Sequence, residues 1–131
     1  MLVTPDQSLR QARRSSAAFI EEAGVQASRT SLPSFARMVV PQDWPPGAFD
    51  LILFSEVLYY LDDAGRAATA RLSLQSLSPG GAIVLVNWHG PTDGFCTGDD
   101  AAEAMIAACA PALQPVTQRR AEKYRLDVLA T

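Results

Sequence analysis

Residues that could do chemistry follow the two most apolar segments of the chain. Ser55 and Glu56 come directly after the apolar residues 51–54, and the Glu56 carboxylate could accept a proton or hold a cation. His89, the only histidine, comes shortly after the second apolar segment, residues 82–87. Histidine is the side chain whose pKa best suits a base near neutral pH. The sequence therefore offers Glu56 and His89 as candidate catalytic residues.

Three aromatic residues stand beside these candidates. Tyr59 and Tyr60 follow Glu56, and Trp88 precedes His89, so all of them could line a substrate pocket. Each residue also has a purely structural interpretation. Glu56 could bond to free amides at a helix start, the tyrosines could pack in the core, Trp88 could plug the sheet edge, and His89 could be solvated. The sequence leaves both interpretations open.

The two apolar segments predict buried strands that would position these residues. Residues 49–54 and 82–87 lack the alternation of a half-exposed strand, which is typical of a parallel sheet covered on both faces. Between them, Asp62 or Asp63 can cap a helix that stops at the Ser-Pro-Gly-Gly sequence of residues 78–81. Such a strand–helix–strand unit predicts parallel strands joined by a right-handed crossover. Ligands bind at the carboxyl ends of such strands, where the candidate residues fall.

Caps and spacing predict two further helices. Thr4 and Pro5 can begin a helix that extends to Ala23. Thr97 can cap another, which Pro111 ends. The expected buried face of the helix between the two apolar strands consists of residues at helical spacing: Ala67, Ala70, Leu74 and Leu77.

Shorter strands are expected near both ends of the chain. Residues 1–3 are either the stub of a strand or a frayed end, and residues 36–40 could form a short strand. Residues 116–122 and 124–130 are typical of one or two strands that could form a hairpin. No repeat or linker divides the sequence, so we expect a single α/β domain over residues 1–131.

Composition excludes several classes of protein. The 131 residues carry a net charge of −3, which argues against a nucleic-acid footprint. No segment is long and apolar enough to span a bilayer, and no signal peptide is visible. Cys96 and Cys109 lack metal-ligand spacing, so we expect no metal site and a reduced, cytoplasmic setting.

Other motifs and charge patterns add little. The hydrolase motif G-x-S-x-G, the phosphate loop and G-x-G-x-x-G do not occur. A mild basic cluster occupies the tail, where strand alternation would split its members between two faces and leave a solvated surface. The cluster comprises Arg119, Arg120, Lys123 and Arg125.

The sequence resembles one enzyme family over most of its length. Residues 49–61, Phe-Asp-Leu-Ile-Leu-Phe-Ser-Glu-Val-Leu-Tyr-Tyr-Leu, resemble the fourth-strand motif of class I S-adenosylmethionine-dependent methyltransferases. Residues 78–81 followed by 82–87 are similar to the family's next turn and fifth strand. The Glu-Val-Leu-Tyr-Tyr-Leu sequence after a Trp-Pro turn is most similar to the nodulation-type enzymes, which N-methylate a chito-oligosaccharide.

The resemblance implies a fold and a cofactor. It implies a partial Rossmann-like methyltransferase sheet with flanking helices, without the first strand. It also implies S-adenosylmethionine as cofactor, with Ser55 and Glu56 beside it. The acceptor would be a small polar molecule, such as a sugar or oligosaccharide methylated on nitrogen. From their place at the strand ends, four residues are expected to face it: Tyr59, Tyr60, Trp88 and His89.

One part of the family pattern has no counterpart here. The family opens with a strand and a Gly-rich turn, and its two cofactor-binding acids would fall at about Leu2 and near Val39, which are not acidic. Without the central first strand, residues 51–54 would form an open apolar edge, through which two copies could form a homodimer. We therefore expect a carboxyl-terminal portion of a methyltransferase or, alternatively, a truncated non-catalytic remnant that binds a partner.

Overall fold

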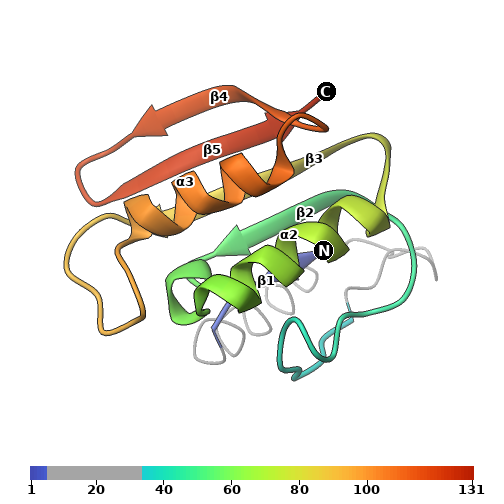
Figure 1. Ribbon diagram of the computed structural model, residues 1–131, viewed down its shortest axis with the longest axis horizontal. Helices are drawn as coiled ribbons and strands as arrows, with labels where there is room; N and C mark the ends of the chain where they lie inside the picture. Colours follow the sequence, from blue (N-terminus) through green and yellow to red (C-terminus); the bar gives the residue numbers. More distant parts are fainter. Residues whose placement is uncertain (6–33) are drawn as a thin grey trace, which may run out of the picture.

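The computed structural model describes residues 1–5 and 34–131, so the helix expected from Pro5 to Ala23 lies almost wholly outside the described residues (Figure 1). The described residues form a five-stranded sheet in the order β1-β2-β3-β5-β4. Helices α2 and α3 lie on one face of this sheet. The strands are β1 (Leu2–Val3), β2 (Phe49–Ser55), β3 (Leu77–Trp88), β4 (Gln114–Arg120) and β5 (Tyr124–Ala130). The helices are the short 3₁₀ turn η1 (Leu58–Tyr60), α2 (Asp63–Ser76) and α3 (Gly98–Cys109).

The predicted parallel pair and terminal hairpin are confirmed. Strands β2 and β3 run parallel, with Leu53 opposite Val84 and Ser55 opposite Val86, so their carboxyl ends meet. Strand β5 is antiparallel to both β3 and β4. An α/β sheet of this kind brings the ends of β2 and β3, and the residues that follow them, to one edge.

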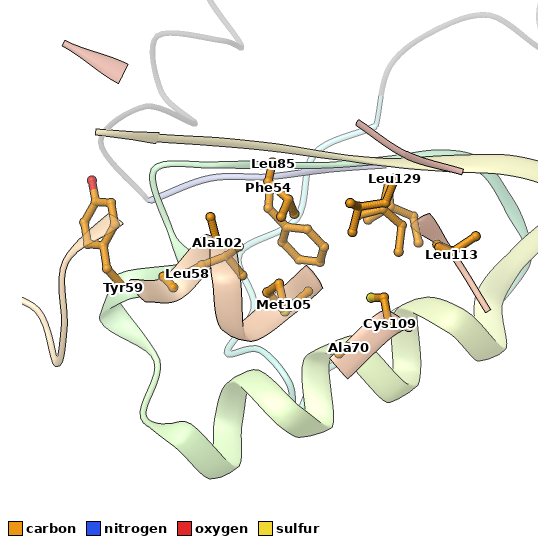
Figure 2. Packing of buried hydrophobic residues seen from close by; sticks show 13 residues of the cluster. Phe54, Leu58, Tyr59, Ala70, Leu85, Ala102, Met105, Cys109, Leu113 and Leu129 are labelled. Carbon is orange, nitrogen blue, oxygen red and sulfur yellow. The ribbon is translucent and has the colours of Figure 1, made fainter. Parts of the chain in front are cut away.

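The core lies between the sheet and the two helices, as Figure 2 shows. Phe54 of β2, Leu85 of β3 and Leu129 of β5 are fully buried on the face that the helices cover. Met105 and Cys109 of α3 lie four residues apart on one side of the helix and pack against them. The predicted cap is also confirmed, because the Thr97 side chain accepts the backbone N–H of Asp100 at 3.1 Å.

Helix α2 buries the expected face only in part: Ala70 is buried in the core and Leu74 packs against it. Asp62 caps the helix, accepting the backbone N–H of Gly65 at 2.7 Å, but Ala67 is exposed. The buried positions include Thr69, Ser73 and Ser76. The hydroxyl of each donates to the carbonyl four residues earlier, at 2.7 to 2.8 Å. Because these bonds satisfy the hydroxyls within the helix, a polar stripe can be buried beside the expected apolar residues.

One expected strand and one expected boundary were wrong. Residues 36–40 form no strand; instead, the Asp43 carboxylate accepts the Val39 N–H at 2.8 Å and closes a turn. Strand β3 begins at Leu77, before the Ser-Pro-Gly-Gly sequence expected to separate helix from strand. Gly80, at φ 77°, supplies backbone freedom within that segment.

The edge of β2 that was expected to be open carries the short strand β1. Leu2 pairs with Leu53 and Val3 with Phe54, both in parallel register. The Met1 ammonium group donates to the Leu51 carbonyl at 2.5 Å, yet Leu51 is still 48% exposed. Strand β1 therefore lies beside the strand that resembles the family's fourth, at the edge where the sequence predicted that the first strand would be missing.

Two classes of feature are not found in the part of the chain that the structure describes. Among its helices, none is long and apolar enough to cross a membrane. Within the same residues, no three metal-ligating side chains gather into a cluster.

Candidate functional site

Glu56 occupies a strained position at the carboxyl end of β2. Its backbone N–H donates to the Val86 carbonyl at 2.9 Å, which ties the residue to β3. Its φ of 59° lies in the left-handed region, which costs a residue with a Cβ about 1–2 kcal/mol. Strain of this kind concentrates at functional sites because the surrounding structure must hold it.

The Glu56 carboxylate binds two neutral donors. Its Oε2 accepts the Tyr59 hydroxyl at 2.5 Å and the Trp88 backbone N–H at 3.1 Å. The 3₁₀ turn η1 brings Tyr59 back over the strand end, and β3 supplies Trp88. We call these three residues the Glu56 cluster. The structure thus brings together three of the residues singled out from the sequence.

The environment keeps the two tyrosine hydroxyls protonated. Burial raises the pKa of Tyr59, and its hydrogen bond to the Glu56 carboxylate raises it further. Tyr59 is therefore a buried core residue, which is one of its two sequence interpretations, and its hydroxyl bonds to a candidate catalytic group. Tyr60 is 45% exposed, and burial of its hydroxyl and the neighbouring Asp93 raise its pKa. The two rings lie 4.8 Å apart between centroids.

Tyr60 faces a hollow that sequence reasoning missed. Asp93, Gly94 and Phe95 line this hollow of about 190 Å³ together with Tyr60. The Phe95 N–H donates to the Tyr59 carbonyl at 2.8 Å, which fixes the loop against η1. No local signal in the sequence reveals this long-range bond.

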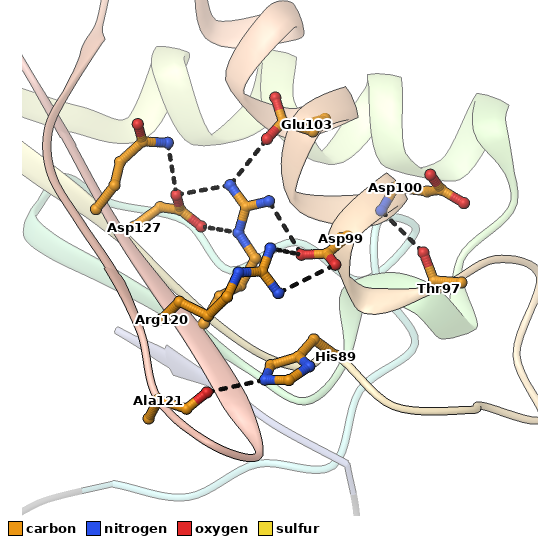
Figure 3. A network of polar contacts seen from close by, with 10 residues as sticks. His89, Thr97, Asp99, Asp100, Glu103, Arg120, Ala121 and Asp127 are labelled. Carbon is orange, nitrogen blue, oxygen red and sulfur yellow. Dashed lines mark hydrogen bonds and ion pairs between the residues drawn. The ribbon is translucent and has the colours of Figure 1, made fainter.

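Trp88 and His89 point toward other partners. The Trp88 indole N–H donates to the Pro91 carbonyl at 3.1 Å, and the ring stacks on His89 with an interplanar angle of 15°. The His89 ring Nε2 lies 2.9 Å from the Ala121 carbonyl, in the turn between β4 and β5 (Figure 3). Because a carbonyl only accepts, Nε2 must carry the proton, which leaves Nδ1 as the ring nitrogen able to accept one.

The structure does not bring His89 to Glu56. No hydrogen bond or ion pair joins their side chains among the residues that the structure describes, and the hydrogen bonds of the His89 backbone and ring run to Lys123 and Ala121. His89 therefore lies at the same edge of the sheet as the Glu56 cluster without belonging to it.

A second group of charged residues lies under the terminal hairpin, and we call it the Arg125 network (Figure 3). Arg125 donates two hydrogen bonds to Asp127, at 2.9 and 2.8 Å. It also pairs with Asp99 at 3.2 Å and with Glu103 at 2.9 Å. Arg120 completes the network with two hydrogen bonds to Asp99.

The expectation of a solvated basic surface is wrong for Arg125. This residue is only 7% exposed, and Asp127 is 1% exposed. The Asp127 carboxylate is the main cause of a raised Arg125 pKa. A buried arginine must be paired in this way, because an unpaired buried charge is costly.

Comparisons with known proteins identify the fold. A scan against models of protein families finds no match, and neither does a search of curated proteins. Solved structures do match. A Pseudomonas syringae protein described as a methyltransferase aligns with a TM-score of 0.61 and 23% identity, over 99% of this chain and 70% of its own.

Two other structures extend the comparison. An O-methyltransferase family protein from Burkholderia thailandensis gives a TM-score of 0.59 and 15% identity, over 97% of this chain and 42% of its own. The N-methyltransferase NodS from Bradyrhizobium japonicum WM9 gives a TM-score of 0.50 and 27% identity, over 66% of this chain and 53% of its own. This chain therefore spans about half or less of the length of these two proteins. It has the α/β fold that these methyltransferases share.

Proposed function

We propose that this chain takes part in S-adenosylmethionine-dependent methyl transfer to a small polar molecule. The narrower form of the proposal is N-methylation of a sugar or oligosaccharide amine in the cytoplasm. The observation that carries it is the Glu56 cluster, a strained carboxylate held at the meeting carboxyl ends of β2 and β3. This edge is where open α/β sheets bind ligands, and the sheet has a methyltransferase fold.

Ser55 and Glu56 would hold one part of the cofactor. The bound cofactor would supply an electrophilic methyl group on a sulfonium centre. Ser55 and Glu56 stand at the strand end where the resemblance puts cofactor-binding residues. The other part fits less well, because Thr4 and Pro5 follow β1 where the family has glycines.

The chain's own contribution would be positioning and proton acceptance. The Tyr59 hydroxyl and the Trp88 N–H both bind Oε2 of Glu56, so they fix the direction of the carboxylate. Positioning of this kind accounts for a large share of catalysis in a bimolecular transfer. Glu56 would then take the proton that the acceptor loses, and His89 Nδ1 is the second candidate base. Tyr60, Trp88 and His89 would face the acceptor.

The residues after β1 favour a second candidate function, because Thr4 and Pro5 are not glycines. In that function the chain would be a non-catalytic module that binds a partner. The partner could be a second copy, because β1 pairs with only part of β2 and Leu51 is still exposed. Size-exclusion chromatography would then give a dimer that Leu51→Lys converts to a monomer.

Transfer of a labelled methyl group tests the main proposal. The chain would be incubated with methyl-labelled S-adenosylmethionine and glucosamine, with N-acetylglucosamine as the blocked-amine control. We expect label on glucosamine alone. Glu56→Gln should lower kcat/KM by at least ~100-fold, the usual contribution of a general base. Glu122→Gln, an exposed acid in the β4–β5 turn, should leave it unchanged. No transfer to either sugar would contradict the narrower proposal.

A further inference from the structure

The hollow beside Tyr60 has the composition of a cation-binding site. Tyr60 and Phe95 present aromatic side chains to it, and Phe95 is 71% exposed. Asp93 adds a carboxylate to the same wall. An aromatic face next to a carboxylate is the arrangement that recognises alkylammonium groups, through the ring quadrupole and the opposite charge.

The charges around the hollow select a cation over an anion. Asp93 and Glu56 are the two charged groups that bear on the Tyr60 hydroxyl, and both are carboxylates. The same two carboxylates raise the pKa of Tyr59. A ligand anion would therefore meet repulsion from both sides, whereas an ammonium group would meet attraction.

The walls of the hollow are held in place before any ligand arrives. The Phe95 N–H donates to the Tyr59 carbonyl, and the Thr92 hydroxyl donates to the Cys96 carbonyl at 2.7 Å. A Cβ on Gly94 would lie 2.2 Å from the Tyr59 carbonyl oxygen, so only glycine allows this approach. Because these walls are already ordered, the loss of conformational entropy on binding is smaller.

The hollow is connected to the Glu56 cluster by the tyrosine pair. The Tyr60 ring contacts the Tyr59 ring, and the Tyr59 hydroxyl contacts Glu56. A volume of about 190 Å³ is small beside the pockets that hold drug-sized ligands, and it can hold an ammonium headgroup with a few carbons. We infer that Asp93, Tyr60 and Phe95 form a binding site for the ammonium group of the methyl acceptor or of its methylated product. The inference deepens the proposed function, and its assignment to the acceptor rests on that function.

Choline and 3,3-dimethylbutan-1-ol test the site as a matched pair, because they share a shape and differ in charge. Each would be titrated into the ¹⁵N-labelled chain while the amide shifts of Gly94 and Phe95 are recorded. We expect choline to bind about tenfold more tightly than the neutral alcohol. Equal shifts with the two probes would overturn the inference.

Variants assign the effect to particular side chains. Asp93→Asn should weaken choline binding about tenfold, and Phe95→Leu about threefold, because the first removes the charge and the second the aromatic face. Glu122→Gln is the control and should bind as the wild type does. Because Phe95 is largely exposed, Phe95→Leu should fold even if Asp93→Asn does not, and an unchanged affinity in Phe95→Leu would contradict the site.

A parallel titration with S-adenosylhomocysteine separates this inference from the proposed function. Choline binding that persists at saturating S-adenosylhomocysteine supports an acceptor site. Displacement of choline by S-adenosylhomocysteine would overturn that assignment and would indicate that the hollow binds the cofactor's own ammonium group. Choline binding without any S-adenosylhomocysteine binding would contradict the proposed function and leave a cation site without its acceptor role.

Discussion

The Glu56 cluster and the Arg125 network both centre on a charged side chain, but they satisfy it in opposite ways. Arg125 is surrounded by carboxylates, and Asp127 alone takes two of its hydrogen bonds. The Glu56 carboxylate instead receives a hydroxyl and a backbone N–H, both neutral. Opposite charges neutralise each other, whereas neutral donors orient a carboxylate and leave its charge in place.

The backbone differs between the two centres as well. Arg125 sits in the regular ladder between β3 and β5, opposite Asn87. Glu56 sits just beyond the end of β2 with a positive φ. A paired charge on a relaxed strand serves stability, and an oriented charge on a strained backbone is typical of a functional site. The comparison can be tested at each centre and at Asn87 between them.

The largest expected effect is on stability at the Arg125 network. Arg125→Met removes the main partner of Asp127, which is 1% exposed, and leaves that carboxylate buried with Gln118 as its remaining donor. We expect the free energy of unfolding in urea to fall by about 3–5 kcal/mol. Arg119→Met, an exposed position on β4, should change it by less than about 0.5 kcal/mol. Similar values for the two variants would contradict a structural role for the network.

Asn87 is expected to limit stability where the two regions meet. It is fully buried, and neither polar atom of its amide has a hydrogen-bond partner in the described part of the chain. Asn87→Leu keeps the branching of the side chain and removes the unsatisfied groups, so the free energy of unfolding should rise by about 1 kcal/mol. Gln75→Leu, on the exposed face of α2, serves as the control. A loss of stability in Asn87→Leu would show that its amide has a partner or a role.

Backbone strain at Glu56 is testable with two truncations. Glu56→Ala and Glu56→Gly both delete the carboxylate, but only glycine adopts φ 59° without a Cβ clash. The glycine variant should therefore be more stable than the alanine variant by about 1 kcal/mol in urea unfolding. If alanine were the more stable of the two, the residue would not be strained.

The smallest effect is a pH dependence at the rim of the Arg125 network. Arg120 is the main cause of a pKa of Asp99 below its usual value of 3.8, with help from Arg125. Because folding lowers the pKa of Asp99, the ionised Asp99 carboxylate stabilises the folded state at pH values above its unfolded pKa. This stabilisation is lost as the pH falls through the pKa of Asp99 in the folded state. The difference in unfolding free energy between wild type and Asp99→Asn should stay constant from pH 7 to about 5 and shrink below about 4. At neutral pH it should be under about 1 kcal/mol, because the pair is partly exposed. A difference that grows in acid would contradict this assignment.

Much of the framework could be predicted from local signals. The parallel pair β2–β3 follows from two uninterrupted apolar runs with a helix between them, and the start of α3 follows from Thr97. The carboxyl ends of neighbouring parallel strands lie at the same edge of a sheet, so the contact between Glu56 and Trp88 could be predicted from the sequence. The terminal hairpin follows from two strand-like segments joined by a short turn.

The other features of the fold and of the candidate site depend on long-range contacts that local sequence patterns do not encode. Arg125 and Asp127 lie two positions apart, so strand alternation puts them on one face, but only tertiary packing determines that the face is buried. The hollow at Asp93 exists because Phe95 bonds to Tyr59, which lies 36 residues earlier in the chain. The stripe on α2 escaped prediction because hydroxyls that bond within a helix behave as small apolar groups.

Calorimetric titration of this chain with S-adenosylhomocysteine tests the central claim most directly. The Glu56 cluster is expected to be part of a cofactor site, so the wild type should bind one equivalent and Glu56→Ala should bind at least ~10-fold more weakly. Arg119→Met should bind as the wild type does. Absence of binding by a chain that unfolds cooperatively in urea would contradict the account and favour the partner-binding function.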